Sequence, residues 1–477
     1  MSDVRTRFAP SPTGYLHVGG IRTAIFGWLL ARQNHGKFIL RLEDADQKRE
    51  VAGADKHIES SLKALGIIYD EGPDIGGPYA PYRQSERLDS YKKWAQKLIN
   101  SGRAYADPYT AEQVDNFRKQ AQAAKQPFLY RNHRPPHPPK WDGTQPLRFL
   151  SDPKDYSWHD EVMGDIKTGP EVIDDFILIK ADGFPTYNFA HIVDDKEMEI
   201  SHVTRTQEFL PSIPNYLNLY EALKIKRPLL ATLPPILAPQ GNKKLSKRDG
   251  AKDVLDYIRE GFLPEALVNF IVSLGWNDGT EQEIFSVDEL IKKFSLNRVQ
   301  QSGARFDEQR LLWMNGHYIR ETPLERLYGL SKSFWSADAD EASDEHKKQV
   351  LALVQERLKY LAELPELSRF FFTDLPINMD LIDNNKQLKK LTHQQMCEML
   401  AKSRESLEQS DFSQADLADR LNNLLEDLEQ KPGVLFSLIR IATTWSPASP
   451  GLAETLSLLG KDKSLERIGR AISALEK

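Results

Sequence analysis

Apolar and polar residues follow two different periods along the first half of the chain. Short β-favouring runs, which predict strands, are followed by apolar residues at helical spacing. The predicted strands cover residues 4–8, 38–42, 200–204 and 229–237. Predicted helices begin near Gly19, at Ala54 and at Glu208. This alternation predicts an α/β domain with a parallel, doubly wound, Rossmann-like sheet over residues 1–100 and 186–250.

Residues 101–185 interrupt this alternation. They contain a proline-rich stretch at residues 134–140 and strand-like runs at 147–149 and 176–180. We interpret this segment as an α+β insertion in the first domain.

From Gly250 onward the pattern becomes helical. We expect a helical domain over residues 251–322 and an all-helical domain over 323–477. One apolar stripe of the last domain predicts a helix face. It consists of Val350, Leu351, Val354, Leu358 and Leu361. Pro and Ser residues at 445–451 should interrupt the last helices.

The turn after the first predicted strand has the properties of a phosphate site. Prolines and a glycine at residues 10–14 break regular structure. Gly19 and Gly20 then open a helix, where free N–H groups and the helix dipole attract phosphate. His17 is placed to donate to a phosphate oxygen, although a histidine there, taken alone, is more often structural.

A second candidate site is the basic string at residues 243–248, Lys-Lys-Leu-Ser-Lys-Arg. A basic loop is usually solvated surface. Ammonium groups on flexible stems can, however, also follow charge into a phosphoryl transition state. Because the two strings occur together, we interpret them as two halves of an ATP site.

Composition limits the class of protein. The 477 residues suggest two to four domains by the usual prior. Cys397 is the one cysteine, so no internal disulfide can form. There is no signal-like or long apolar run, and we expect a cytoplasmic protein with no membrane contact. The net charge of −6 requires any RNA contact to use local basic patches.

Beyond these properties, the sequence resembles class I aminoacyl-tRNA synthetases, specifically bacterial-type glutamyl-tRNA synthetases. His17-Val18-Gly19-Gly20 is similar to the family's HIGH signature, and Lys244-Leu245-Ser246-Lys247-Arg248 to its KMSKS loop. Further strings follow in family order. They are residues 41–46 (RLEDAD), 82–85 (YRQS), 182–187 (DGFPTY), 193–195 (VDD), 261–267 (GFLPEAL) and 313–316 (WMNG).

The resemblance implies a reaction without a protein nucleophile. Glutamate would be joined to the α-phosphate of ATP, with Mg²⁺, and the glutamyl group would pass to the terminal ribose of tRNA(Glu). Catalysis would then depend on positioning and charge stabilisation. The family also implies that residues 101–185 bind the tRNA acceptor end, 251–322 the stem and 323–477 the anticodon. We expect a monomer.

Site residues follow from the same resemblance. The catalytic residues would be His17, Lys244 and Lys247. ATP would be bound by Gly19, Gly20, Glu208, Ile236, Leu237 and Lys247. Glutamate would be bound by Arg7, Ala9, Ser11, Glu43, Tyr187 and Arg205, because two carboxylates call for two cations. Asp46 and Arg49 would contact the terminal adenosine of tRNA, and Arg357 the third anticodon base.

The chain also departs from the family pattern. Thr206, Gln207 and Phe209 replace common residues between and beside Arg205 and Glu208, and His191 stands where relatives carry Asn or Val. The insertion has no cysteine, so we expect no structural zinc and no metal ligand from the protein.

Several related functions stay open on the sequence alone. They are a glutaminyl-tRNA synthetase, a shortened paralogue that glutamylates a modified base, an enzyme that also charges tRNA(Gln), and a non-catalytic RNA-binding relative. The first usually reads Pro-Glu-Pro-Asn-Gly at the turn, where this chain has Pro-Ser-Pro-Thr-Gly. The second lacks the C-terminal domain. ATP–pyrophosphate exchange would separate the fourth from an enzyme.

Overall fold

The computed structural model describes residues 4–246 and 252–477. The chain divides into two compact units. The first unit comprises Met1–Ile258 and Leu267–Asp307, and the second comprises Arg259–Ala266 and Glu308–Lys477. The finer division into four domains expected from the sequence stays a prediction.

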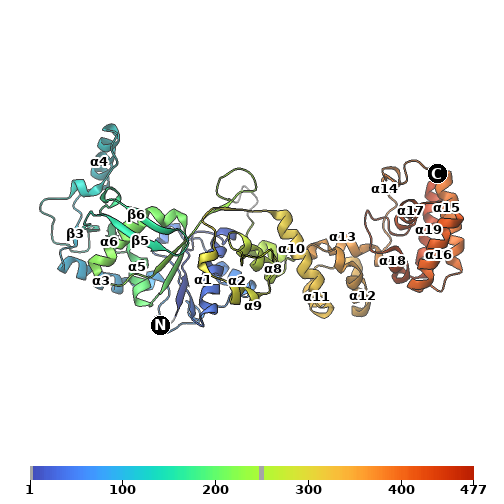
Figure 1. Ribbon diagram of the computed structural model, residues 1–477, viewed down its shortest axis with the longest axis horizontal. Coiled ribbons are helices and arrows are strands. Elements are labelled where there is room, and N and C mark those ends of the chain that lie inside the picture. The colour runs from blue at the N-terminus through green and yellow to red at the C-terminus, as the bar shows by residue number, and fades with distance from the viewer. Residues whose placement is uncertain (1–3, 247–251) are drawn as a thin grey trace. The chain divides into compact units, whose positions relative to one another are not determined.

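The first unit is built on parallel strands, as predicted (Figure 1). β1 (Arg5–Phe8) pairs in parallel with β2 (Lys37–Leu40). The crossover between them is α1 (Val18–Gln33). β8 (His202–Thr206) and β9 (Leu229–Leu233) form a second parallel pair. The N–H of Ser201 donates to the carbonyl of Arg5 over 2.9 Å, which joins the two pairs through β1.

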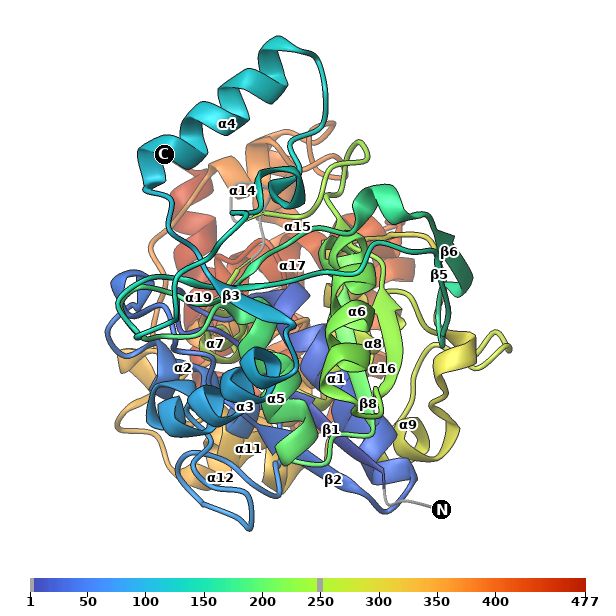
Figure 2. The same ribbon diagram turned by 90° about the vertical axis from the view of Figure 1, so that its left-hand side faces the viewer.

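Helices complete the crossovers of this unit. Figure 2 shows α5 and α6 beside β8. The helices of the segment up to residue 293 have the following bounds: α2 (Ala54–Ala64), α3 (Leu88–Asn100), α5 (Tyr187–Glu197), α6 (Ile213–Leu223), α7 (Val254–Arg259), α8 (Pro264–Ser273) and α9 (Val287–Lys293).

Two predicted elements are shorter than expected because prolines divide them. The predicted helix from Glu208 begins as a 3₁₀ segment, Gln207–Ser212, which contains Pro211, and α6 starts only at Ile213. The predicted strand at 229–237 is broken after Leu233 by two prolines, which cannot donate to a strand ladder. Its remainder, β10 (Ile236–Leu237), pairs with β11 (Ala304–Arg305) instead.

Arg22 of α1 fixes the segment that carries β10. Its side chain is buried and donates to the carbonyl of Leu274 over 2.8 Å and to the carbonyl of Pro234. Burial without a carboxylate partner lowers the pKa of Arg22 to about 10. The start of α1 and the approach to β10 are therefore tied together through a buried guanidinium.

The insertion is α+β, as predicted, and it also extends the neighbouring sheet. β3 (Ala104–Ala106), β4 (Leu147–Phe149) and β7 (Ile177–Ile179) form an antiparallel sheet. The hairpin of β5 (Tyr156–Asp160) and β6 (Gly164–Thr168), which the sequence analysis missed, joins the edge at β9. α4 (Ala111–Ala123) contains no buried residue and projects from the unit in both views (Figures 1 and 2).

Residues 308–477, all of which the structure describes, contain helices and no strand. The longer helices are α10 (Glu308–Glu321), α11 (Leu324–Ser331), α12 (Asp344–Val354), α15 (His393–Glu408), α16 (Gln414–Asp427), α17 (Pro432–Thr444), α18 (Leu452–Leu459) and α19 (Lys461–Leu475). The shorter ones are α13 (Leu364–Ser368) and α14 (Asp380–Asp383). Cys397 of α15 lies 3.8 Å from the carbonyl oxygen of Ile472 in α19.

The apolar stripe at 350–361 is buried as expected, but it is not one helix. α12 ends at Val354 and is followed by a 3₁₀ turn, Gln355–Arg357. Tertiary hydrogen bonds compete with helix continuation: the side-chain amide of Asn315 donates to the carbonyl of Lys359, and the N–H of Leu361 donates to Gly261. A single helix through this stripe would carry Arg357 on its edge, which is wrong, because Arg357 lies in the 3₁₀ turn.

In the described part of the chain, no helix combines the length and the apolar character needed to cross a membrane.

Candidate active site

A cavity of about 600 Å³ lies where β1, β2 and β8 end. The carboxyl ends of parallel strands meet here, which is where α/β folds bind ligands. The cavity brings together ten of the residues expected from the sequence. They are Arg7, Ala9, Ser11, Gly20, Glu43, Asp46, Arg49, Tyr187, Arg205 and Glu208.

Arg205 is the cation of this cavity that most needs a ligand. Its side chain is buried, and its Nε and Nη1 atoms have no hydrogen-bond partner. The guanidinium carbon lies 5.5 Å from the ring centre of Tyr216 and 5.6 Å from that of Phe209. A buried guanidinium with unpaired donors is costly unless an anion satisfies it. The site therefore suits a carboxylate at Arg205.

Arg7 also lines the cavity, but the protein already pairs it. Its Nε donates to Oδ1 of Asp195 over 3.0 Å, and Nη1 of Arg41 donates to the same oxygen over 2.8 Å. Burial opposes ionisation of Asp195, yet the two guanidinium groups hold the pKa of its carboxyl well below the usual value. Arg7 therefore takes part in a buried ion pair with Asp195.

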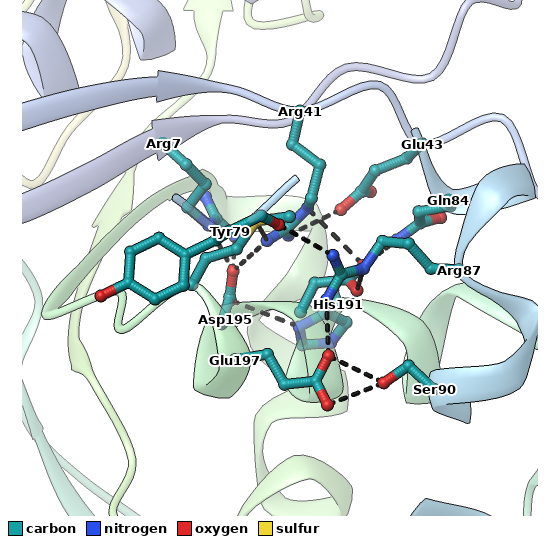
Figure 3. Close-up of polar contacts among 12 residues, drawn as sticks. Arg7, Arg41, Glu43, Tyr79, Gln84, Arg87, Ser90, His191, Asp195 and Glu197 are labelled. Atoms are coloured by element: carbon teal, nitrogen blue, oxygen red, sulfur yellow. Dashed lines mark hydrogen bonds and ion pairs between the residues drawn. The ribbon is translucent and has the colours of Figure 1, made fainter. Parts of the chain in front are cut away.

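Arg41 holds Glu43 as well. Nη2 of Arg41 donates to Oε1 of Glu43 over 3.0 Å, and both side chains are buried (Figure 3). Burial raises the pKa of Glu43 against the pull of Arg41 and Arg7. A carboxylate held in this way can accept a hydrogen bond from a ligand ammonium group in the cavity.

The polar network continues behind the cavity into α3. Nε of Arg87 donates to Oδ1 of Asp194 over 2.7 Å, and its Nη2 donates to Glu197 over 2.6 Å. Ser90 of α3 donates to the same Glu197 carboxylate (Figure 3). The sequence analysis did not assign these roles. The available signal was a pair of adjacent acids, Asp194 and Asp195, directly after the apolar residues Ile192 and Val193 of α5.

The rings of His191 and Tyr187 lie together on one face of α5, tilted by 34° with their centres 4.9 Å apart. His191 is buried, and Nδ1 lies 3.8 Å from Oδ2 of Asp195. Burial lowers the pKa of His191 to about 3, so its ring is neutral near pH 7. The departure at this position therefore places a neutral imidazole behind Tyr187.

The three departures beside Arg205 differ in their contacts. Thr206 Oγ1 donates to Oε1 of Glu208 over 2.9 Å. The ring of Phe209 lies 5.2 Å from that of Tyr187 and lines the cavity. Gln207 is exposed. Two of the three thus take part in the site.

His17 caps the N-terminus of α1. Its Nδ1 accepts the N–H of Gly19 over 3.1 Å, and its carbonyl accepts the N–H of Gly20 over 3.0 Å. These N–H groups were expected to be free for phosphate. The correction has a simple cause, because an N-cap side chain satisfies the first donors of its helix. With Nδ1 as an acceptor, the neutral ring carries its proton on Nε2.

The second motif lies beside Glu208. Nζ of Lys244 lies 2.9 Å from Oε2 of Glu208, and both side chains are more than half exposed. Lys244 lowers the pKa of Glu208. Ile236 is buried in β10, and its carbonyl accepts the N–H of Leu245 over 2.8 Å. Lys247 and Arg248 lie outside the described residues.

Five expected nucleotide residues do not line the cavity. They are His17, Gly19, Ile236, Leu237 and Lys244. Lys244 is nevertheless connected to it through Glu208.

The expected tRNA contacts lie in different units. Asp46 and Arg49 line the cavity and form a weak, exposed pair at 4.0 Å. Arg357 belongs to the second unit and is exposed. The pKa of the half-buried Arg440 is lowered mainly by burial and further by the charge of Arg357.

Among residues 4–246 and 252–477, no group of three or more His, Cys, Asp or Glu side chains is placed to hold a metal ion.

Comparisons with known proteins agree with this geometry. Residues 3–313 match the catalytic domain of class I tRNA synthetases (E and Q), and residues 326–472 match an anticodon binding domain. The chain is 43% identical to a glutamate–tRNA ligase of Dehalococcoides mccartyi, over 99% of this chain and 98% of that one. It is 40% identical to one from Clostridium botulinum, over 99% of each chain.

A solved structure agrees as well. The crystal structure of a glutamate tRNA ligase from Elizabethkingia meningosepticum, in complex with its amino acid, superposes with a TM-score of 0.88 at 33% identity. The match covers 99% of this chain and 100% of that one. The chain therefore belongs to the class I tRNA synthetases, in the glutamate–tRNA ligase family.

Proposed function

We infer that the chain is a glutamate–tRNA ligase that uses ATP to activate glutamate and then transfers it to tRNA(Glu). The observation that carries this function is the buried guanidinium of Arg205, which lines the cavity and has donors without a partner. The family membership supplies the reaction class.

In the first step a carboxylate oxygen of glutamate attacks the α-phosphorus of ATP, and pyrophosphate leaves. We propose that Arg205 holds the side-chain carboxylate, that Arg7, fixed by Asp195, faces the other one, and that Glu43 accepts from the ammonium group. Ser11 and Tyr187 would contact the polar edges of the amino acid, and Ala9 would contact its backbone. This division of charges opposes glutamine, whose amide leaves Arg205 without an anion.

His17, Lys244 and Lys247 would stabilise the phosphates, and Mg²⁺ bound with ATP would supply further positive charge there. Gly20 lines the cavity, and a side chain on Gly19 would meet the ring of His17 at 3.0 Å, which supports close packing at this helix start. Ile236 and Leu237 would pack on adenine, and Glu208 would hold the ribose side.

In the second step the terminal ribose hydroxyl of tRNA attacks the activated carbonyl and AMP leaves. Asp46 and Arg49, at the cavity, would contact the terminal adenosine. We assign the acceptor end to residues 101–185, the stem to 251–322 and the anticodon to 323–477. The matched anticodon binding domain supports the last assignment.

The decisive experiment measures glutamate-dependent ATP–pyrophosphate exchange, without and with tRNA, and then charging of tRNA(Glu) and tRNA(Gln) side by side. We expect exchange with glutamate and charging of tRNA(Glu). Exchange driven equally by glutamine would show that the pocket has been assigned wrongly.

We further propose that the enzyme holds no structural zinc, because the cysteine-free insertion cannot build a thiolate site. Elemental analysis of the purified protein should find no stoichiometric zinc, while omission of Mg²⁺ should abolish activity. One tightly held zinc per chain would contradict this. A monomeric, cytoplasmic enzyme is proposed as well, and light scattering tests the first of these properties.

A further inference from the structure

His57 connects the segments that carry the two signature motifs. It belongs to α2, outside both motifs. Its Nε2 lies 2.7 Å from Oδ2 of Asp253, which follows the basic motif in the chain. Its Nδ1 accepts the N–H of Leu16 over 3.4 Å, and the ring of Tyr15 stacks on it at 4.6 Å. One imidazole thus contacts the residues on both sides of the nucleotide site.

The same two segments also pair through their backbones. His17 and Asp253 form an antiparallel bridge, and the N–H of Val254 donates to the carbonyl of Leu16 over 3.3 Å. Oδ1 of Asp253 accepts the N–H of Leu255 over 2.8 Å, which orients the carboxylate at the start of α7. The backbone of His17 is therefore fixed between α1, which it caps, and the segment that Asp253 anchors.

The contact between His57 and Asp253 is sheltered from water. Their side chains are 12% and 11% exposed. The Nε2–Oδ2 contact is short, although it lacks the alignment of a straight hydrogen bond.

We propose that His57 and Asp253 form a clasp that positions His17 and the segment after the basic motif for adenylate formation. His57 is a positioning residue, since it does not line the cavity and acts through Leu16, His17 and Asp253. This inference rests on the proposed function, whose chemistry gives it a measurable effect.

The test uses the full-length protein and pyrophosphate exchange at saturating tRNA(Glu). His57→Ala should lower kcat about 10-fold, because small displacements of positioned groups cost rate, and should leave the KM for glutamate within about twofold. His57→Gln keeps an amide within reach of Asp253 and should recover most of kcat. Lys56→Ala, exposed on the same helix, should match the wild type.

A double-mutant cycle separates the clasp from two independent effects. Asp253→Asn removes the charge but can still accept the N–H of Leu255. If the two residues act together, the double variant should be no slower than the slower single variant.

The clasp would be overturned if the loss of kcat in the double variant equalled the product of the two single losses. Wild-type kcat in His57→Ala would overturn it as well. A loss of kcat accompanied by an equal fall in melting temperature, with no recovery in His57→Gln, would also overturn it. The proposed function fails separately, if the wild-type enzyme shows no exchange with glutamate.

Discussion

At the scale of single residues, we propose that Arg205 selects the amino acid that the cavity accepts. Arg205→Ala should lower kcat/KM for glutamate, because the buried carboxylate of the substrate loses its charged partner. The expected loss of transition-state stabilisation is about 2–3 kcal/mol. Arg205→Lys should recover little, since an ammonium group cannot replace the planar fork. The measurement is pyrophosphate exchange at varied glutamate. Lys226→Ala, exposed beyond α6, is the matched control. An unchanged KM for glutamate in Arg205→Ala would show that Arg205 does not bind this substrate.

His191 should make the first unit sensitive to mild acid. Its pKa is about 3 in the folded protein, chiefly through burial, and about 6.5 in an unfolded chain. Below pH 6.5 the unfolded state binds the extra proton, so the free energy of unfolding falls as the pH is lowered, by about 2 kcal/mol between pH 7 and pH 5.

His191→Asn removes the group that takes up this proton, so the free energy of unfolding should depend less on pH. The measurement is the melting temperature of both proteins across that pH range. His137→Asn, exposed in the insertion, should retain the wild-type slope. Parallel curves for the wild type and His191→Asn would contradict the assignment.

The site residues could be predicted from the sequence better than their partners. The positions of Arg7 and Arg205 followed from the family pattern, and both lie at the cavity. The pairing of Arg7 with Asp195 could not be predicted, because it joins residues far apart in the chain whose meeting depends on the fold. The capping role of His17 was not evident from the sequence, because Ser, Thr, Asp and Asn are the usual N-cap side chains.

Elements were predicted well where periodicity was strong and poorly where tertiary contacts decided. The parallel strands and the helical second half agree with the structure. The apolar pattern of the β5–β6 hairpin is too short to be distinguished from irregular chain. Its pairing with β9 joins residues far apart in the chain, so the local sequence does not indicate it. The end of α12 is set by Asn315 and Gly261, which lie outside that helix.

The corrected position of Arg357 sharpens one prediction. In a 3₁₀ turn after α12, its exposed side chain lies near the half-buried Arg440, and two cations there suit an anionic or acceptor-rich ligand. Arg357→Gln should reduce the preference for tRNA(Glu) over tRNA(Gln) by about 1–3 kcal/mol, the scale of one base contact. Side-by-side charging measures this.

Lys359→Gln, exposed next to that turn, serves as the control. An unchanged ratio in Arg357→Gln, or equal charging of both tRNAs by the wild type, would show that Arg357 does not govern the choice.

At the scale of the whole molecule, the two compact units should unfold as separate transitions. Leu400 is fully buried in the core shared by α15, α17 and α19. Leu400→Ala should lower the stability of the second unit by about 2–5 kcal/mol through a cavity, without shifting the transition of the first unit. Calorimetry with Lys402→Ala as the exposed control tests this. A common shift of both transitions would show that the units unfold as one.

The single thiol of the chain, Cys397, allows the accessibility of one helix pair in the second unit to be measured. Its sulfur contacts α19 from α15, and burial raises its pKa, so the native thiol should be slow to react. The rate of alkylation then reports how accessible this half-buried thiol is between α15 and α19, because no other cysteine in the chain competes for the reagent. The enzyme thus has one natural site for a chemical probe, and no cysteine has to be introduced by mutation. A fluorophore attached there would report on this position alone.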